Sequence, residues 1–258
     1  MLLEGRVTIV TGAASGIGLA IATRFAREGA VVVAADVNEV GLAEALRSLR
    51  LQGLSLEPVV ADASLPEDVG GLVDHAFARH ERLDAVVANA AISAGRPVED
   101  TSPDHWDRVL AVNLRGPYLL ARAAIPHFRR AGRGAILNIA SVNGFWAEPR
   151  RAAYAAAKGG LIALTRSIAI DYGHLGIRCN CICPGWVDTP GAQGVFERYA
   201  DPEAERAQGA ARHALGRLGQ PHEIAALAAF LVGDESSFCT GHPFIVDGGL
   251  TAGRPESQ

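Results

Sequence analysis

Cysteine is scarce in this sequence, with four residues among 258. Three of them, Cys179, Cys181 and Cys183, alternate along one segment, and only Cys239 remains elsewhere. A zinc site usually spaces its ligands two to four residues apart within a pair and needs a second pair. The pattern therefore favours reduced cysteines packed on one face of a strand. The eight histidines are scattered without paired spacing, so we expect no metal.

Long apolar runs and basic runs are also missing. No stretch of 18 apolar residues is present, which argues against a membrane-spanning helix. The N-terminal segment MLLEGRVTIVTG carries an acid and a glycine where a signal peptide needs a basic segment and a longer apolar one. A net charge of −4 argues against a nucleic-acid partner. We therefore expect a soluble, cytoplasmic protein that binds neither membrane nor nucleic acid.

Short apolar runs recur along the chain and lack strict alternation, which is typical of parallel strands covered on both faces. They begin at Val7, Val31, Ala85, Ala135 and Phe244. Helical patterns lie between them, such as the apolar repeat from Ile17 to Phe25 that ends before Gly29. The alternation predicts an α/β fold, a doubly wound, Rossmann-type parallel sheet with helices on both faces. We expect a single domain over residues 1–258, with a loose tail at 251–258.

One segment, residues 190–213, interrupts this rhythm. We expect it to be mostly irregular, with a charged helical piece in FERYADPEAERAQ at 196–208. A long insertion beyond a strand end commonly forms a lid over the ligand crevice. The prediction is a substrate-binding lid, and a solvated surface excursion is the alternative.

A glycine-rich turn, TGAASGIG at residues 11–18, joins the first strand to the first helix. Glycines let the backbone turn tightly and approach a diphosphate, which then meets the positive end of the helix. The spacing differs from the GxGxxG fingerprint, and three glycines in a turn can also be ordinary loop chemistry. The candidate cofactor-binding residues here are Gly12, Ser15, Gly16, Ile17 and Gly18.

Asp36 closes the second strand, 18 residues beyond Gly18. Its carboxylate can accept hydrogen bonds from both adenosine ribose hydroxyls, and it would repel a 2′-phosphate. The expected cofactor is therefore NAD, although Asp36 could instead cap the helix that begins near Asn38. Further candidates follow the third and fourth strands; these are Asp62, Ala63 and Asn89.

A tyrosine and a lysine, Tyr154 and Lys158, stand four residues apart in YAAAK, so a helix places them on one face. A tyrosine hydroxyl is a poor base at neutral pH unless a cation favours the phenolate, and Lys158 is such a cation. Ser141 follows the apolar run AILNIA and can bond the same reacting oxygen. A solvated helix pair is the ordinary alternative.

Asn113 is a further candidate because Pro117 follows four residues later within a helical pattern. Proline has no N–H to bond the carbonyl of residue 113. That carbonyl could hold a water that links Lys158 to solvent, or the proline could produce a kink without any further role.

Together these motifs resemble the short-chain dehydrogenase/reductase family, from Leu3 to about Leu250. The turn at 11–18 resembles the family's cofactor turn, and NAA at 89–91 resembles its NAG signature. PGWVDT at 184–189 and TGHPFIVDGG at 240–249 resemble its two C-terminal signatures. The family's catalytic tetrad is matched by Asn113, Ser141, Tyr154 and Lys158.

The resemblance implies a role for each matched residue. Tyr154 would be the catalytic acid and base, and Ser141 would position and polarise the substrate oxygen. Lys158 would bind the nicotinamide ribose and lower the pKa of the tyrosine. Val187 and Thr189 would hold the nicotinamide carboxamide. Relatives commonly pair the helices that carry Asn113 and Tyr154 between subunits, which implies a homotetramer.

The expected function is transfer of hydride between NAD(H) and a secondary alcohol or ketone. Polar groups mixed with tryptophan near the crevice suit a small polar substrate, such as a sugar or hydroxy acid. The substrate-binding candidates are Ser141, Asn143, Trp146, Tyr154 and Trp186, and charged neighbours near the crevice are Glu148, Arg150 and Arg151. The alternatives are a 3-oxoacyl-thioester reductase of the same family and a non-catalytic NAD-binding scaffold.

Overall fold

Seven strands form one parallel sheet in the computed structural model, which describes residues 1–93 and 95–253. Their order across the sheet is β3-β2-β1-β4-β5-β6-β7. The strands are β1 (Val7–Thr11), β2 (Val31–Asp36), β3 (Glu57–Val60), β4 (Ala85–Ala88), β5 (Gly134–Ile139), β6 (Ile177–Pro184) and β7 (Pro243–Val246). Chain order reverses between β1 and β4, and ligands of such sheets bind in the crevice beyond the carboxyl ends of the strands at this point.

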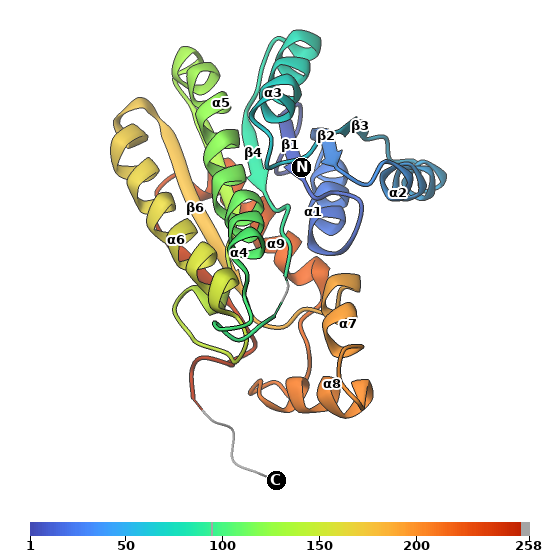
Figure 1. The fold of residues 1–258 in the computed structure, drawn as a ribbon. Coiled ribbons are helices and arrows are strands. Elements are labelled where there is room, and N and C mark those ends of the chain that lie inside the picture. The colour runs from blue at the N-terminus through green and yellow to red at the C-terminus, as the bar shows by residue number, and fades with distance from the viewer. Residues whose placement is uncertain (94, 254–258) are drawn as a thin grey trace.

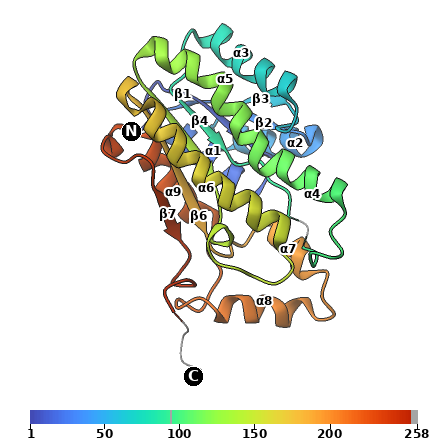
Figure 2. The same ribbon diagram turned by 60° about the vertical axis from the view of Figure 1, so that its left-hand side comes forward.

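Helices cover both faces of the sheet, as Figures 1 and 2 show. The helices are α1 (Gly16–Arg27), α2 (Glu39–Leu51), α3 (Pro66–His80), α4 (Pro103–Leu110), α5 (Gly116–Ala131), α6 (Ala152–Tyr172), α7 (Pro190–Phe196), α8 (Pro202–Ala211) and α9 (Pro221–Val232). One core cluster joins the sheet to α1, α2 and α9, and another joins it to α3, α5 and α6. The predicted doubly wound α/β fold is confirmed.

The central strands are buried as their apolar sequences predicted, whereas the edge strands β3 and β7 are partly exposed. All residues of β1 and of β4 are buried, because helices lie on both sides of them. Cys181 and Cys183 of β6 pack with Leu161 and Ile162 of α6, and Cys179 is buried on the same side. The three alternate cysteines are therefore core residues, which leaves the carboxyl ends of the strands for the site.

The prediction of a mostly irregular 190–213 segment is wrong. The segment contains α7 and α8, and residues 197–201 separate them, so the charged helix begins at Pro202 rather than near Phe196. Thr189 and Asp201 cap these helices through their side-chain oxygens, each followed by a proline in the first turn. This cap-and-proline pattern is a helix start signal that is visible in the sequence.

The C-terminal segment is better fixed at its start than predicted. Thr251 donates through its backbone N–H and its hydroxyl to Asp247, at 2.8 and 2.6 Å. The rest of the expected loose tail, residues 254–258, lies outside the described residues. Across the part of the chain that the structure describes, no helix combines the length and apolarity needed to cross a bilayer.

Candidate active site

The turn after β1 adopts backbone conformations that glycine favours. Gly12 and Gly16 have φ angles of +67° and +55°. Gly18 is closely packed rather than left-handed, because a Cβ there would lie 2.0 Å from the carbonyl oxygen of Gly12. Ser15 precedes the first turn of α1 and makes no side-chain cap bond among the described residues. The turn therefore presents the N-terminus of α1 to the cavity, where an anion is favoured.

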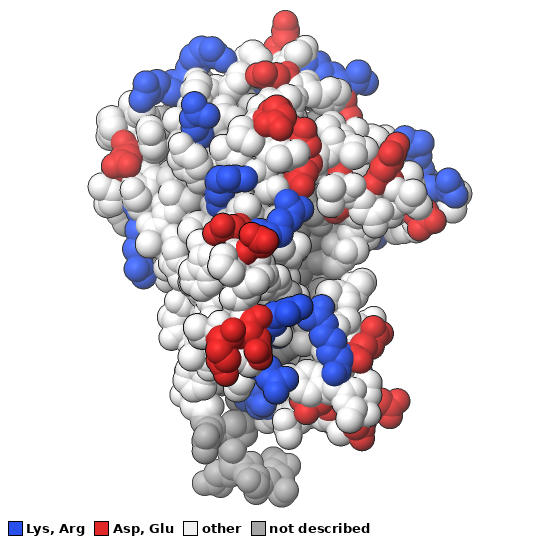
Figure 3. All heavy atoms as spheres, in the orientation of Figure 1, with Lys and Arg blue, Asp and Glu red and all other residues white. Residues whose placement is uncertain are grey.

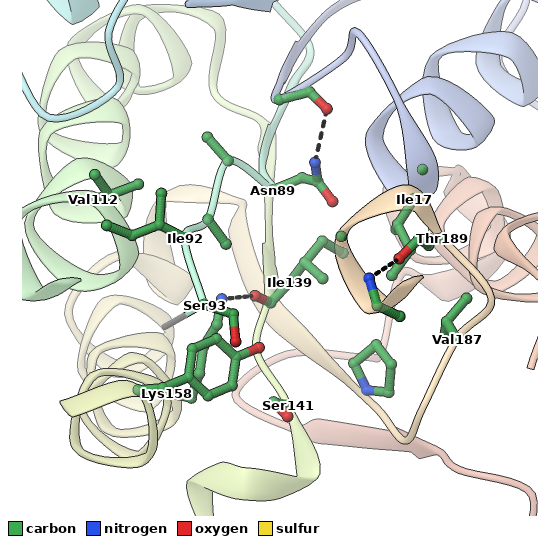
Figure 4. A pocket seen from close by; sticks show the side chains of 18 of the residues that line it. Ile17, Asn89, Ile92, Ser93, Val112, Ile139, Ser141, Lys158, Val187 and Thr189 are labelled. Atoms are coloured by element: carbon green, nitrogen blue, oxygen red, sulfur yellow. Dashed lines mark hydrogen bonds between the residues drawn. The ribbon is translucent and has the colours of Figure 1, made fainter. Parts of the chain in front are cut away.

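Asn89, directly after β4, holds this turn in place. Its amide donates to the carbonyls of Thr11 and Gly12 at 3.0 and 3.1 Å. In return, the Thr11 hydroxyl accepts bonds from the backbone N–H groups of Asn89 and Ala90. Figure 4 shows the Asn89 amide engaged in this way. Asn89 therefore positions the glycine turn, and it also borders the cavity.

Asp36 lies at the end of β2 and borders the same cavity. Its carboxylate accepts from the backbone N–H groups of Ala14 and Asn38, at 3.0 and 2.9 Å. The helix α2 is capped by Asn38 itself, whose side chain accepts from Gly41. The alternative in which Asp36 caps this helix is therefore wrong, and each carboxylate oxygen keeps a further acceptor site for a ligand.

Asp62 and Ala63 lie just beyond β3 and line the cavity. Burial alone would raise the pKa of Asp62, but hydrogen bonds from Ser64 and Arg108 lower it below its usual range. Arg108, which the sequence analysis did not single out, also lines the cavity and holds Asp62 through a 3.2 Å bond. This carboxylate is therefore ionised and fixed.

Lys158 is the only lysine in the chain and is 2% exposed. Its ammonium donates to the main-chain oxygen of Ile139 at 2.6 Å, a bond drawn in Figure 4. Burial lowers the pKa of Lys158 to about 8. The ammonium lies 5.6 Å from the centroid of the Tyr154 ring. The helix α6 thus brings both residues to Ser141, which follows β5.

The pKa of Tyr154 is raised because its phenol is removed from bulk water. The Ser141 hydroxyl and the positive charge of Arg151 lower this pKa, and the negative charge of Glu148 raises it. The expectation named Lys158 as the cation that acts on the tyrosine. In this arrangement Arg151 has that effect, with its guanidinium carbon 6.0 Å from the ring centroid.

Asn113 is fully buried in a π-helical turn, Ala111–Arg115, between α4 and α5. Its side-chain amide is paired with Ile92, accepting from the backbone N–H and donating to the carbonyl, both at 2.8 Å. Pro117 offers no N–H either to the carbonyl four residues earlier or to the one five residues earlier. The side chain of Asn113 thus fixes the backbone of Ile92, so a water relay would have to use the backbone carbonyl of Asn113.

These groups border one cavity of about 650 Å³, of the size that small-molecule sites have. It extends from Asp36 and the glycine turn to Ser141 and Tyr154, and Figure 3 shows a hollow in the surface beside α7 and α8. The predicted residues that line it are Gly12, Ser15, Gly16, Ile17, Asp36, Asp62, Ala63, Asn89, Ser141, Asn143, Tyr154, Lys158, Trp186, Val187 and Thr189. Gly18 and Asn113 lie behind its wall. Two features of this cavity fit a dinucleotide. The glycine turn leaves room for a diphosphate, and the carboxylate of Asp36 lies at the far end.

Glu148 organises the substrate end of the cavity. Its carboxylate accepts from the Asn143 amide at 3.1 Å and from the Trp186 indole at 3.0 Å, and it pairs with Arg212 at 3.5 Å. Trp186 therefore lines the cavity with its indole N–H engaged, and Asn143 lines it with one of its two amide N–H groups engaged. Sequence reasoning could not foresee this, because the three partners come from segments far apart in the chain.

Trp146 does not reach the cavity. The turn Val142–Gly144 ends before it, its backbone N–H bonds to the carbonyl of Val142, and its side chain is 43% exposed. The expected substrate contact of Trp146 is therefore corrected. In residues 1–93 and 95–253, no group of three or more His, Cys, Asp or Glu is arranged to hold a metal ion.

Comparison with known proteins identifies the family. A family model described as enoyl-(acyl carrier protein) reductase matches residues 12–251. Cyclopentanol dehydrogenase of Comamonas sp. is 39% identical over 250 residues, covering 97% of this chain and 98% of the relative. Cis-4-hydroxycyclohexanecarboxylate dehydrogenase of Sinomonas cyclohexanicum is 42% identical over 248 residues, covering 96% and 97%. The chain belongs to the short-chain dehydrogenase/reductase family.

A solved structure agrees with this assignment. The aldohexose dehydrogenase of Thermoplasma acidophilum has a TM-score of 0.90 and 35% identity, covering 99% of this chain and 98% of that one. The chain is therefore an oxidoreductase of the class that acts on secondary alcohols with a nicotinamide cofactor. The alternative of a non-catalytic scaffold is not supported.

Proposed function

We propose that this protein is an NAD(H)-dependent dehydrogenase that oxidises a small polar secondary alcohol and reduces the corresponding ketone. One observation carries the proposal. Ser141, Tyr154 and Lys158 meet at one end of the cavity that has the glycine turn and Asp36 at its other end. A hydroxyl group and a dinucleotide can therefore be bound together in one enclosed space.

The roles follow from the chemistry of each side chain. When bound, the nicotinamide accepts hydride from the alcohol carbon, or returns hydride to the ketone. Tyr154 takes the proton from the alcohol oxygen in oxidation and returns it in reduction. Ser141 donates a hydrogen bond that holds the same oxygen beside the phenol. Lys158, fixed by Ile139, binds the nicotinamide ribose, and Arg151 supplies the positive charge that favours the phenolate.

The proton leaves the site along the residues behind Tyr154. The buried ammonium of Lys158 can pass it to a water held by the main-chain carbonyl of Asn113. Pro117 supports this step, because it has no N–H and therefore leaves a main-chain carbonyl in the preceding turn, Ala111–Arg115, without a helical hydrogen bond.

The cofactor is NAD rather than NADP in this proposal. Gly12, Ser15, Gly16 and Ile17 receive the diphosphate at the start of α1, and Gly18 gives the turn its close packing. Asp62, Ala63 and Asn89 border the adenosine side. Asp36 supports NAD because its carboxylate accepts ribose hydroxyls and repels a 2′-phosphate.

Thr189 and Val187 serve the nicotinamide end. A Cβ at Gly16 would lie 3.3 Å from the Thr189 side chain, so the start of α7 and the glycine turn are in close contact. Thr189 also caps α7, which lines the cavity, whereas α8 does not. We assign α7 as the cavity side of a lid over residues 190–213 that belongs to the same single domain. Stacking of Trp186 on Phe196, with centroids 5.0 Å apart, links this lid to the site.

The assembly is a homotetramer in this proposal. Trp106 of α4 and Tyr118 of α5 support it, since these large side chains are 37% and 47% exposed on the helices expected to pair between subunits. Light scattering after size exclusion measures the mass, and a monomer at micromolar concentration would contradict the tetramer. The row of buried thiols in β6 fits a reducing compartment, so we place the protein in the cytoplasm.

A 3-oxoacyl-thioester reductase is the second candidate. One relative favours it, because a 3-oxoacyl-[acyl-carrier-protein] reductase of Thermotoga maritima is 34% identical to this chain over 250 residues. The use of NAD inferred from Asp36 counts against it.

The test compares Tyr154→Phe with Tyr172→Phe, a matched change at the far end of α6. Oxidation of cyclohexanol and cyclopentanol is followed as NADH formation, and NADH binding is followed by its fluorescence. We expect Y154F to lose about 100-fold or more in kcat while it still binds NADH, and Y172F to keep both. Near-normal turnover by Y154F would overturn the catalytic assignment.

A further inference from the structure

Arg151 is a cation in the cavity wall without a carboxylate partner among the described residues. It immediately precedes α6, three residues before Tyr154. Its guanidinium bonds to the Ser93 hydroxyl, and its central carbon lies 5.2 Å from the Trp186 ring centroid. An arginine has five N–H donors, so one bond to a neutral hydroxyl leaves most of them for a ligand.

The nearest acid of the same wall is already engaged. Glu148 is 10% exposed and accepts from Asn143, Trp186 and Arg212. It forms no ion pair with Arg151 within 4.0 Å in the described part of the chain. The cavity wall thus holds one carboxylate, Glu148, whose charge is already paired, and one arginine, Arg151, that has no ion-pair partner among the described residues.

Elimination leaves few other polar groups for the substrate. The Asn143 amide and the Trp186 indole donate to Glu148, and the Lys158 ammonium donates to Ile139. Ser141 and Tyr154 are committed to the reacting oxygen. Among the predicted substrate contacts, the neutral donor that remains is the second N–H of the Asn143 amide, whereas the Arg151 fork offers several donors and a positive charge.

We infer that the substrate carries a carboxylate, which Arg151 binds while the secondary alcohol lies between Ser141 and Tyr154. This inference rests on the proposed function and narrows its substrate class to hydroxy acids. The planar guanidinium suits a carboxylate because it can donate two parallel bonds. The guanidinium carbon is 6.0 Å from the Tyr154 ring, a separation that a short chain or a small ring can bridge. The aromatic face of Trp186 packs on the guanidinium and holds it in place.

Binding of an unreactive acid tests the inference without turnover. Calorimetry on the enzyme saturated with NADH compares cyclohexanecarboxylate with cyclohexanecarboxamide, which has the same shape and no charge. We expect the wild type to bind the acid at least tenfold more tightly than the amide. Arg151→Gln should abolish this preference, and Arg151→Lys should retain part of it.

Arg150→Gln is the matched control, because Arg150 is the adjacent arginine and is exposed outside the cavity lining. It should keep the wild-type preference. Equal or undetectable binding of both compounds by the wild type, or a preference that survives in R151Q, overturns the inference. Oxidation of cyclohexanol or of 4-hydroxycyclohexanecarboxylate, and its loss in Y154F, tests the proposed function separately, because turnover of either alcohol suffices for it. The two failures are therefore distinguishable.

Discussion

The ammonium of Lys158 donates to the main-chain oxygen of Ile139, two residues before Ser141. This bond ties α6 to the end of β5, so the helix and the strand that carry the reacting groups cannot shift independently. The same bond keeps a buried charge satisfied, although burial still lowers the pKa of that lysine to about 8.

A pH-dependent stability difference is expected for Lys158→Met. The pKa of Lys158 is about 8 in the folded protein and near 10.5 when unfolded, so the unfolded chain binds more protons between these values. The unfolding free energy of the wild type should therefore rise relative to K158M between pH 8 and 10.5, by about 3 kcal/mol. Urea unfolding without cofactor at several pH values measures it. A difference that stays constant with pH would show that the lysine is not perturbed.

Opposite pH shifts are expected for Arg151→Gln and Glu148→Gln. Arg151 lowers the pKa of Tyr154 and Glu148 raises it, against a background in which burial raises it. The rise of kcat/KM with pH for cyclohexanol oxidation should move to higher pH in R151Q and to lower pH in E148Q. A neutral alcohol is used so that substrate charge does not contribute. Shifts in the same direction would contradict this electrostatic account.

Asp36→Asn should relax the choice of cofactor. The change keeps the size of the side chain and removes the negative charge that repels a 2′-phosphate. The ratio of kcat/KM for NADP to that for NAD should rise at least about tenfold. Glu39→Gln, on the exposed first turn of α2, is the charge-matched control and should leave the ratio unchanged. Faster turnover with NADP in the wild type would refute the NAD assignment.

Two glycine substitutions should have opposite effects on stability. A Cβ at Gly18 would lie 2.0 Å from the Gly12 carbonyl oxygen, so Gly18→Ala should lower the unfolding free energy by about 3 kcal/mol or more. Gly71 is exposed inside α3 with nothing within 4 Å of such a Cβ. Gly71→Ala should raise the free energy by about 1 kcal/mol. Urea denaturation compares both with the wild type, and an unaffected G18A would mean that the turn can rearrange.

Local spacing made much of this molecule predictable. Tyr154 and Lys158 are one helical turn apart, and Asp36 directly ends a strand, so their placement follows from a short stretch of chain. The carboxyl ends of parallel strands lie at one edge of the sheet. The predicted site residues that follow these strand ends therefore lie together around the cavity. The helices α7 and α8 were also signalled, by the Thr189–Pro190 and Asp201–Pro202 pairs.

Long-range pairing was not predictable in this way. The donors of Asn143, Trp186 and Arg212 contact Glu148 only in the folded chain, and no periodicity of the sequence predicts these contacts. The same applies to Arg151. Its donors are open for a ligand because the neighbouring acid, Glu148, pairs with Arg212 instead. Trp146 was misplaced because a single tight turn, Val142–Gly144, decides which later side chains reach the cavity.

The solitary lysine gives the protein a built-in chemical reporter. With one ε-amine in the chain, an amine-selective reagent has only Lys158 and the N-terminal amine to react with. Lys158 is 2% exposed and its ammonium donates to Ile139, so we expect its labelling to be slow in the folded protein and faster once the chain unfolds. The extent of labelling at Lys158, measured by mass spectrometry, should therefore report the folded fraction of a preparation before its substrate is known.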